Sequence, residues 1–229
     1  MAHGAINARL ASAAELTRQN AIFADIGTDH AYLPLFLLDE GRIEYAYCSD
    51  INEGPLASAE RNAKECGRED KMSFILTDGA TVLRDKGITD YAICGMGGEL
   101  IADIISRAPH LYDGEINLIL QPMSRQATLR KFLAAEGFSV KCESYSYDGG
   151  KYYVCLLATY TGHRRVIDEI EAEIGFSDVE YRGDEARRGY LTTLYNARLR
   201  AAEGKELGGM ENPPERALID AINEVRKTL

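Results

Sequence analysis

Residues 23–34, FADIGTDHAYLP, begin like the first turn of a nucleotide-binding fold and then depart from its pattern. The apolar run ends in Asp25 and Gly27, as at the carboxyl end of a first Rossmann-type strand. A dinucleotide-binding turn has glycines at two further positions, where this chain carries Asp29 and Ala31. The turn therefore predicts a nucleotide-like ligand that tolerates a carboxylate where a diphosphate would otherwise lie.

Outward from this turn, short β-rich runs alternate with helical stretches as far as Tyr160, which predicts a parallel sheet with helical crossovers. A final pair of strands over 138–160 surrounds Asp148-Gly149-Gly150, a hairpin signal. We therefore expect an α/β fold with a seven-stranded, mostly parallel sheet and an antiparallel C-terminal strand. The five parallel strands are expected at 22–26, 45–51, 72–78, 90–95 and 116–122.

The helix signals lie between these runs. Asn52 and Ser124 are predicted N-caps, because short polar side chains accept hydrogen bonds from the first backbone N–H groups of a helix. Helices are expected to start at these caps and end at Gly67 and Gly137. Three further helices are expected at 5–19, 31–41 and 98–107.

After residue 160 the sequence changes to long stretches that are rich in charged residues and have the apolar spacing of helices. Apolar residues recur at helical spacing from Asp184 to about Glu203 and again from Pro214, with a glycine- and proline-rich connection over 204–214. We expect a catalytic, cofactor-binding domain over 1–160 and a C-terminal helical hairpin, resembling a short coiled coil, over 161–229.

The bulk composition narrows the class of protein. The chain has 229 residues, 45% of them hydrophobic, and a net charge of −10, which argues against nucleic-acid binding by bulk charge. No secretory signal and no membrane-spanning run is visible. The five cysteines form no C-x-x-C pair, so we expect free thiols in a reducing cytoplasm and no metal site.

The predicted strand ends supply a cofactor site, because ligands of open parallel sheets bind at the carboxyl ends of the strands. Asp50, with Ile51 beside it, ends the second strand and suits two ribose hydroxyls. Asp78 and Gly79 end the third strand and suit an adenine ring. A diphosphate beside Asp29 would meet like charges, which cost about 4 kcal/mol at about 4 Å. S-adenosylmethionine, with a ribose, an adenine, a cationic end and no phosphate, fits better.

Two simpler interpretations remain open at single positions. Gly27 is also what any tight strand-to-helix turn requires. Asp50 would also complement the dipole of the helix that follows it.

Five stretches together resemble the bacterial tRNA adenine-N1 methyltransferase family that modifies adenine 22. They are ADIGTDHAYLP (24–34), SDINEGPL (49–56), TDGATVL (77–83), ICGMGGELIADII (93–105) and LILQPMSRQATLRKFL (118–133). The resemblance implies a class I methyltransferase fold, S-adenosylmethionine as the methyl donor and the D-arm of tRNA as the target. It also implies that Asp25, Gly27, Asp50, Asp78, Gly79, Gly95 and Met96 form the cofactor site.

The motif that follows the fourth strand distinguishes two kinds of methyl transfer. Enzymes that methylate exocyclic amines usually carry an Asn- or Asp-Pro-Pro-Tyr motif there, whereas this chain has CGMGG. Adenine N1 needs no proton removed, so we expect direct in-line transfer to the ring nitrogen of an extruded base. Asp29, with His30 and Tyr32 nearby, is the predicted catalytic group that contacts the N6 amine. Alternatives are a helix cap for Asp29, a structural imidazole for His30 and a core role for Tyr32.

Substrate contacts are expected at three places. Gly97 leaves room for a flat base, and Gln121-Pro122 follows the fifth strand where a base would rest. The RNA backbone would be held by basic residues near the predicted strand ends and on the C-terminal hairpin, if these do not simply form a solvated surface. They are Arg125, Arg130, Lys131, Lys151, Arg182, Arg187, Arg188, Arg198 and Arg200.

The partner is therefore expected to be tRNA, bound by a monomer. A small-molecule methyltransferase and a non-catalytic module that binds cofactor or RNA are the alternatives.

Overall fold

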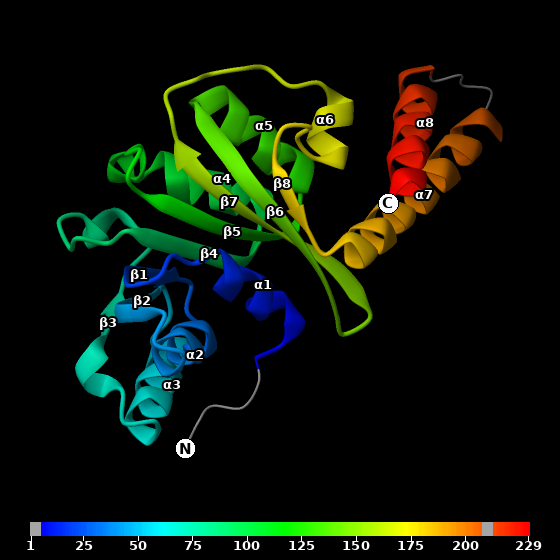
Figure 1. Cartoon of the computed structure of the whole chain (residues 1–229). Coiled ribbons are helices and arrows are strands. Elements are labelled where there is room, and N and C mark those ends of the chain that lie inside the picture. The colour runs from blue at the N-terminus through cyan, green and yellow to red at the C-terminus, as the bar shows by residue number, and fades with distance from the viewer. Residues whose placement is uncertain (1–5, 208–212) are drawn as a thin grey trace.

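The structure, a computed structural model, describes residues 6–207 and 213–229 (Figure 1). Its strands are β1 (Ala21–Ile26), β2 (Ile43–Asp50), β3 (Met72–Leu76), β4 (Asp90–Gly97), β5 (Asn117–Ser124), β6 (Phe138–Asp148), β7 (Lys151–Tyr160) and β8 (Glu180–Arg182). They form an eight-stranded sheet of order β3-β2-β1-β4-β5-β7-β6-β8. Strands β1 to β5 pair in parallel, β7 is antiparallel to β5 and β6, and β8 is parallel to β6.

The helices cover both faces of the sheet and extend beyond one end (Figure 1). They are α1 (Ala8–Leu16), α2 (Tyr32–Asp39), α3 (Glu53–Glu65), α4 (Gly98–Ser106), α5 (Gln126–Glu136), α6 (Glu169–Ile174), α7 (Asp184–Leu207) and α8 (Pro213–Thr228). Three 3-10 turns lie at Glu69–Lys71, Thr81–Leu83 and Pro109–Leu111.

Two hydrophobic clusters lie on opposite faces of the sheet. Because successive side chains of a strand point to opposite faces, Leu118 and Leu120 of β5 join one cluster and Ile119 joins the other. The first cluster packs against α4 and α5, and the second against α1, α2 and α3. Burial on both faces explains the nearly continuous apolar strands of the sequence.

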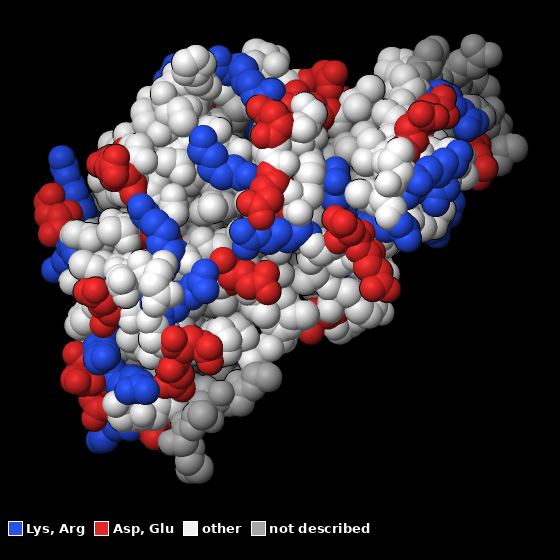
Figure 2. Space-filling model, in the orientation of Figure 1, with Lys and Arg blue, Asp and Glu red and all other residues white. Residues whose placement is uncertain are grey.

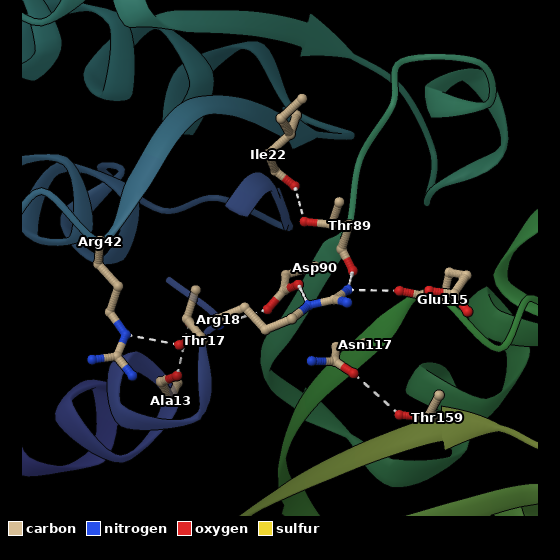
Figure 3. Close-up of polar contacts among 10 residues, drawn as sticks. All are labelled: Ala13, Thr17, Arg18, Ile22, Arg42, Thr89, Asp90, Glu115, Asn117 and Thr159. Carbon is tan, nitrogen blue, oxygen red and sulfur yellow. Dashed lines mark hydrogen bonds and ion pairs between the residues drawn. The ribbon is translucent and has the colours of Figure 1, made fainter. Parts of the chain in front are cut away.

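Helix α1 is attached to the amino end of the sheet by Arg18, which follows it. The Arg18 Nε donates a hydrogen bond to Asp90 Oδ1 at 2.6 Å, and its backbone N–H donates to Asp90 Oδ2 at 2.9 Å. Figure 3 shows the guanidinium between this carboxylate and the carbonyl oxygens of Thr89 and Glu115. Since Asp90 is fully buried, the pair fixes the position of α1 over the sheet.

The sheet differs from the expected one by an extra strand. The predicted count of seven is wrong by one, because β8 pairs with β6 over Cys142 to Ser144. A run of three residues carries too little alternation to be recognised in a sequence. The domain division at residue 160 stays a prediction, and β8 lies beyond that boundary within the same sheet.

The N-cap position predicted at Asn52 is confirmed, and the cap predicted at Ser124 is wrong. Asn52 stands at the N-cap of α3, but its side chain makes no capping bond, and its backbone N–H instead donates to Asp50 Oδ1 at 2.7 Å. Ser124 belongs to β5, and Arg125, in the left-handed conformation, precedes α5. Strand pairing and the preceding loop determine these helix starts more strongly than a side-chain cap does.

The C-terminal helices α7 and α8 lie side by side beyond the edge of the sheet (Figure 1), as the expected helical hairpin. Leu191, Leu218 and Ile222 form their buried seam together with Ile174 of α6. The predicted connection over 204–214 is shorter than expected, because α7 continues to Leu207 and α8 begins at Pro213. Residues 208–212 lie outside the described part of the chain.

Candidate cofactor and substrate site

A cavity of about 630 Å³ opens at the carboxyl ends of β1 to β4, within the size range of small-molecule sites. Its lining holds ten of the predicted cofactor and catalytic residues. These are Asp25, Gly27, Asp29, Tyr32, Asp50, Ile51, Asp78, Gly79, Gly95 and Met96. The sheet order places the ends of β3, β2, β1 and β4 in a row, so these side chains, far apart in sequence, meet along one edge.

The loop after β1 has an unusual backbone. Gly27 has φ of 76°, which glycine adopts without strain, and a Cβ there would lie 2.1 Å from Met96 Cε, so another residue would displace the end of the Met96 side chain. His30 and Ala31 follow with φ of 63° and 55°, although neither is glycine. Left-handed non-glycine residues cost about 1–3 kcal/mol each and concentrate at functional sites. Asn62 of α3 supports the loop by donating a hydrogen bond to the His30 carbonyl at 2.9 Å.

Asp25 is the buried acid of the cavity. Burial raises its pKa from 3.8 to about 6, partly offset by a hydrogen bond that Thr28 Oγ1 donates to its Oδ2 at 2.5 Å. The carboxylate of Asp50 raises this pKa further, whereas the guanidinium of Arg9 lowers it. A desolvated carboxylate at the bottom of the cavity is well suited to a cationic ligand, which would relieve the cost of its charge.

Asp78 and Asp29 lie nearer the solvent. Arg107 of α4 donates two hydrogen bonds to the Asp78 carboxylate, at 2.8 and 3.2 Å, and these hold the pKa of Asp78 below its ordinary value. Asp29 is 76% exposed and lies 3.2 Å from His30 Nε2. Asp29 does not cap α2, because the N-cap of that helix is Ala31 and no side chain caps it. The capping alternative for Asp29 is therefore wrong.

Residues 6–156 match the family described as "Methyltransferase domain". A Bacillus subtilis protein named tRNA (adenine(22)-N(1))-methyltransferase is 32% identical over 74% of this chain and 71% of its own length. The chain belongs to this family of tRNA adenine-N1 methyltransferases.

Solved structures of relatives have the same fold. A Streptococcus pneumoniae protein described as a candidate tRNA (m1A22) methyltransferase, in complex with S-adenosyl-L-methionine, has a TM-score of 0.81 at 28% identity, over 97% of this chain and 100% of that one. A Streptococcus agalactiae protein assigned to the NADB-Rossmann superfamily has a TM-score of 0.82 at 29% identity, over 97% of both chains. The fold is thus that of a Rossmann-like class I methyltransferase, and S-adenosylmethionine is the cofactor of this family member.

Other residues predicted to line the methyltransferase site lie outside the cavity lining. The side chain of Gln121 is 1% exposed, and its Oε1 accepts hydrogen bonds from Arg9 Nη1 at 2.8 Å and from the Gly95 N–H at 3.1 Å. Pro122 is buried beside it. Gly97 lies against Ser124 of β5. Gln121 therefore supports the cavity wall from behind, and the expectation of a base resting on it does not match this geometry.

The cavity also contains residues that the sequence interpretation missed. Asn7, Arg9 and Leu10 come from the start of α1, and Cys94, Leu100, Ile104 and Met123 from β4, α4 and the end of β5. Burial raises the pKa of the Cys94 thiol to about 12, so this group is neutral. The amphipathic pattern of α1 identified a helix but contained no signal that its first turn lines this cavity.

The basic residues expected to hold RNA divide into buried and exposed groups. Arg130 is fully buried in an ion pair with Glu143, and Arg187 is 8% exposed with its guanidinium 3.3 Å from the centre of the Tyr181 ring. Neither presents its charge to a large ligand, so these two expectations are wrong. Arg188, the next residue, is exposed.

Within 6–207 and 213–229, no helix is long and apolar enough to cross a membrane. The same part of this methyltransferase shows no cluster of three or more His, Cys, Asp or Glu side chains arranged to hold a metal ion.

Proposed function

We propose that this chain transfers the methyl group of S-adenosylmethionine to N1 of adenine 22 in the D-arm of tRNA. The observation that carries the proposal is the row of carboxylates at the ends of β1, β2 and β3, which continues to the Gly95-Met96 turn of β4 without an Asn- or Asp-Pro-Pro-Tyr motif. The row of carboxylates suits a cationic nucleoside cofactor. The absence of the motif suits a ring nitrogen as the acceptor of the methyl group.

The residues present fit the cofactor. Asp50 at the end of β2 accepts hydrogen bonds from the two ribose hydroxyls. Asp78, held by Arg107, accepts from the exocyclic amine of the adenine, and Gly79, with φ of 76°, lets the ring approach the backbone. The bound cofactor supplies a methyl group on a positively charged sulfur. Like charges at Asp25, Asp29 and Asp50 disfavour ligands that carry a diphosphate.

The target base has to be brought in line with that methyl group. The mouth of the cavity carries four exposed apolar or aromatic side chains, Tyr32, Ile51, Leu100 and Met123, which offer a surface for a flat, extruded base. The Tyr32 ring stacks on the His30 ring with centroids 5.3 Å apart, beside Asp29. Asp29 accepts a hydrogen bond from the N6 amine, which stabilises the positive charge that develops on the adenine ring. Positioning of this kind contributes at most about 7–11 kcal/mol.

Methyl transfer to tRNA tests the proposal directly. Purified protein is incubated with radiolabelled S-adenosylmethionine and with an unmodified tRNA that has adenine at position 22, or the same tRNA with guanine there. We expect label in the first tRNA and none in the second. Equal labelling of the two tRNAs would refute adenine 22 as the target. Tight cofactor binding without methyl transfer to any RNA would indicate a binding module.

The roles of Asp50 and Asp29 are distinguishable by mutation. Asp50→Ala removes the ribose acceptor, so we expect cofactor affinity to fall roughly 10- to 100-fold, as for the loss of a hydrogen bond to a charged group. Asp29→Ala is expected to keep that affinity within about threefold and to lower kcat by roughly 100-fold, the scale of one electrostatic contact to a transition state. Calorimetry and single-turnover kinetics measure the two effects.

A charge-matched control is Glu44→Ala, which removes an exposed carboxylate of β2 outside the cavity lining. This variant should behave as wild type in both assays. If Asp29→Ala loses cofactor affinity as strongly as Asp50→Ala, the assigned division of roles is incorrect.

We further propose that the protein meets tRNA in the cytoplasm and acts as a monomer. None of the five cysteines, which all lie in the described part of the chain, forms a disulfide bond, and this suits a reducing compartment. Light scattering on the protein eluting from a gel-filtration column, with and without tRNA, measures the oligomeric state.

A further inference from the structure

The loop between β1 and α2 contains two successive residues in the left-handed conformation. His30 and Ala31 have φ of 63° and 55°, and Ala31 is the N-cap of α2 without a side-chain capping bond. Neither residue is a glycine, so contacts with the surrounding structure have to offset the strain of both. Ala31 is fully buried in the hydrophobic cluster that packs against α3, which supplies part of this support.

A second contact with the loop comes from a polar side chain of α3. The Nδ2 of Asn62 donates a hydrogen bond to the His30 carbonyl oxygen at 2.9 Å. Ala59 and Ala63 are the buried residues of α3, and Asn62 lies beside them on the face that approaches the loop. Asparagine is a poor residue for a helix interior, because its side chain competes for backbone hydrogen bonds. The carbonyl that it holds gives this asparagine a reason to be there.

The residues on either side of this backbone face the cavity. Asp29 and Tyr32 both line it, yet the side chain of Asp29 is 76% exposed and Tyr32 is 46% exposed, so burial does not fix them. Rotation about the dihedrals of His30 and Ala31 would turn Asp29 relative to Tyr32. A hydrogen bond to the His30 carbonyl opposes this rotation, because the carbonyl turns with the whole peptide plane.

We propose that Asn62 is a positioning residue for methyl transfer. By holding the peptide plane between His30 and Ala31, it keeps Asp29 and Tyr32 in the relative orientation that the target base requires. Asn62 lies outside the described lining of the cavity, so it acts through the loop and contacts neither the cofactor nor the base. The proposal rests on the proposed function, in which Asp29 contacts the adenine during transfer.

Amide hydrogen exchange of the ligand-free protein tests whether Asn62 holds the loop. The Leu35 N–H donates to the Ala31 carbonyl at 3.1 Å and reports on the loop. The Gly27 N–H donates to the Ser49 carbonyl of β2 at 2.8 Å and reports on the sheet. In Asn62→Leu, which keeps most of the bulk and loses the donor, the Leu35 amide should exchange roughly tenfold faster and the Gly27 amide less than about threefold faster. Equal acceleration of both amides would overturn the proposal in favour of a general structural role.

Single-turnover kinetics with tRNA test whether transfer depends on this orientation. Asn62→Leu should slow methyl transfer roughly 10- to 100-fold, the effect of a small misplacement of a reacting group, and change the KM for S-adenosylmethionine less than about threefold. In the Asp29→Ala background the same substitution should have little further effect, because the two residues act through one contact. Additive losses would overturn the proposal, as would a raised KM for S-adenosylmethionine with an unchanged rate. Asn62→Ala, which also lacks the donor, is measured alongside and should give the same pattern.

Arg68→Gln is the matched control. Arg68 follows α3, and its Nε donates to Asp39 Oδ1 at 2.9 Å, so this ion pair joins α3 to α2 at the ends of both helices that lie away from the cavity. Its loss should lower the melting temperature and leave the transfer rate unchanged. If Arg68→Gln slows transfer as much as Asn62→Leu does, the rate depends on helix packing in general and the proposal is overturned.

The two measurements separate this proposal from the proposed function. The exchange experiment contains no RNA, so a wild-type protein that methylates no tRNA refutes the function while the exchange rates still decide whether Asn62 holds the loop. If wild type methylates tRNA and Asn62→Leu alters the exchange but not the transfer rate, the function stands and the positioning role is refuted.

Discussion

At the scale of single residues, the buried carboxylate of Asp25 in the cavity lowers the stability of the folded protein. Burial raises the pKa of this carboxyl group from 3.8 to about 6, so its ionised form destabilises the folded protein at neutral pH. The hydrogen bond from Thr28 offsets only part of this cost. A cationic cofactor would stabilise the same carboxylate, which makes Asp25 a residue retained for binding at the expense of stability.

Asp25→Asn should therefore separate stability from binding. Replacing the carboxylate by a neutral amide of the same shape should raise the free energy of unfolding at pH 7 by about 1–3 kcal/mol, since one pKa unit corresponds to about 1.4 kcal/mol. The same variant should bind S-adenosylmethionine much more weakly. Urea unfolding and calorimetry measure the two quantities, and a variant less stable than wild type would contradict the assignment.

The pH dependence follows with a definite sign. Because the folded pKa of Asp25 lies above its ordinary value, the folded protein takes up a proton as pH falls through about 6. As the pH falls from 6 to 4, the free energy of unfolding of the ligand-free protein should rise because of this group. The affinity for the cationic cofactor should fall over the same interval. Calorimetric titrations at pH 7.5, 6 and 5 test this, and in Asp25→Asn the dependence below pH 7 should be smaller.

At the scale of elements, one buried ion pair joins the sheet to the C-terminal region. Arg130 of α5 donates hydrogen bonds to both oxygens of Glu143 on β6, at 2.8 and 2.7 Å, and its Nη1 donates to the Ala172 carbonyl of α6 at 3.0 Å. Tyr145 donates to the same carboxylate at 2.7 Å. All four groups meet where α5, β6 and α6 pack together.

Arg130→Met should be strongly destabilising. It removes the partner of a fully buried carboxylate, and breaking such a pair costs about 3–5 kcal/mol. The double variant Arg130→Met with Glu143→Leu should recover part of this loss, because no buried charge is then left unpaired. Urea unfolding measures both, and a single variant within about 1 kcal/mol of wild type would show that the pair matters little.

At the scale of the whole molecule, the protein is acidic and has to bind an acidic partner with a limited part of its surface. Figure 2 shows basic and acidic side chains interspersed over one face, with basic side chains gathered along the C-terminal helices. The β6–β7 turn lies beside the start of α7, since a Cβ on Gly189 would come within 2.2 Å of the Tyr152 ring. Exposed Tyr147 and Arg188 therefore lie in one region, at the same end of the sheet as the cavity.

Two adjacent arginines should behave differently when mutated. Arg188→Ala, at an exposed position, should weaken tRNA binding and reduce its salt dependence without changing the melting temperature. Arg187→Ala should lower the melting temperature, because it removes the guanidinium that stacks on Tyr181. Filter binding over a range of salt concentrations and thermal unfolding provide the measurements, and equal effects of the two variants on tRNA affinity would contradict this distinction.

Much of the fold follows from local pattern. Alternating apolar strands and helices of the right length predict the parallel sheet, and acids or glycines at Asp25, Gly27, Asp50 and Asp78 predict where a nucleoside cofactor binds. These features are readable because backbone periodicity and the geometry of a tight turn depend on neighbours in sequence. The pattern likewise predicted the C-terminal helical hairpin, although it carried no information about β8, whose three residues are too few to show a period.

Charge, in contrast, cannot be assigned to core or surface from the sequence. Arg130, Arg187 and Arg188 look alike in the sequence, yet two are buried and one is exposed, because burial depends on partners such as Glu143 and Tyr181 brought together by tertiary packing. Arg9 enters the cavity for the same reason: α1 packs across the sheet and its end is fixed by Arg18 on Asp90. The sequence by itself determined the fold class and predicted the acids that line the cavity, since both depend on local pattern. Which cations pair inside the protein and which remain for ligands was decided only by the tertiary structure, because that depends on contacts between residues far apart in the chain.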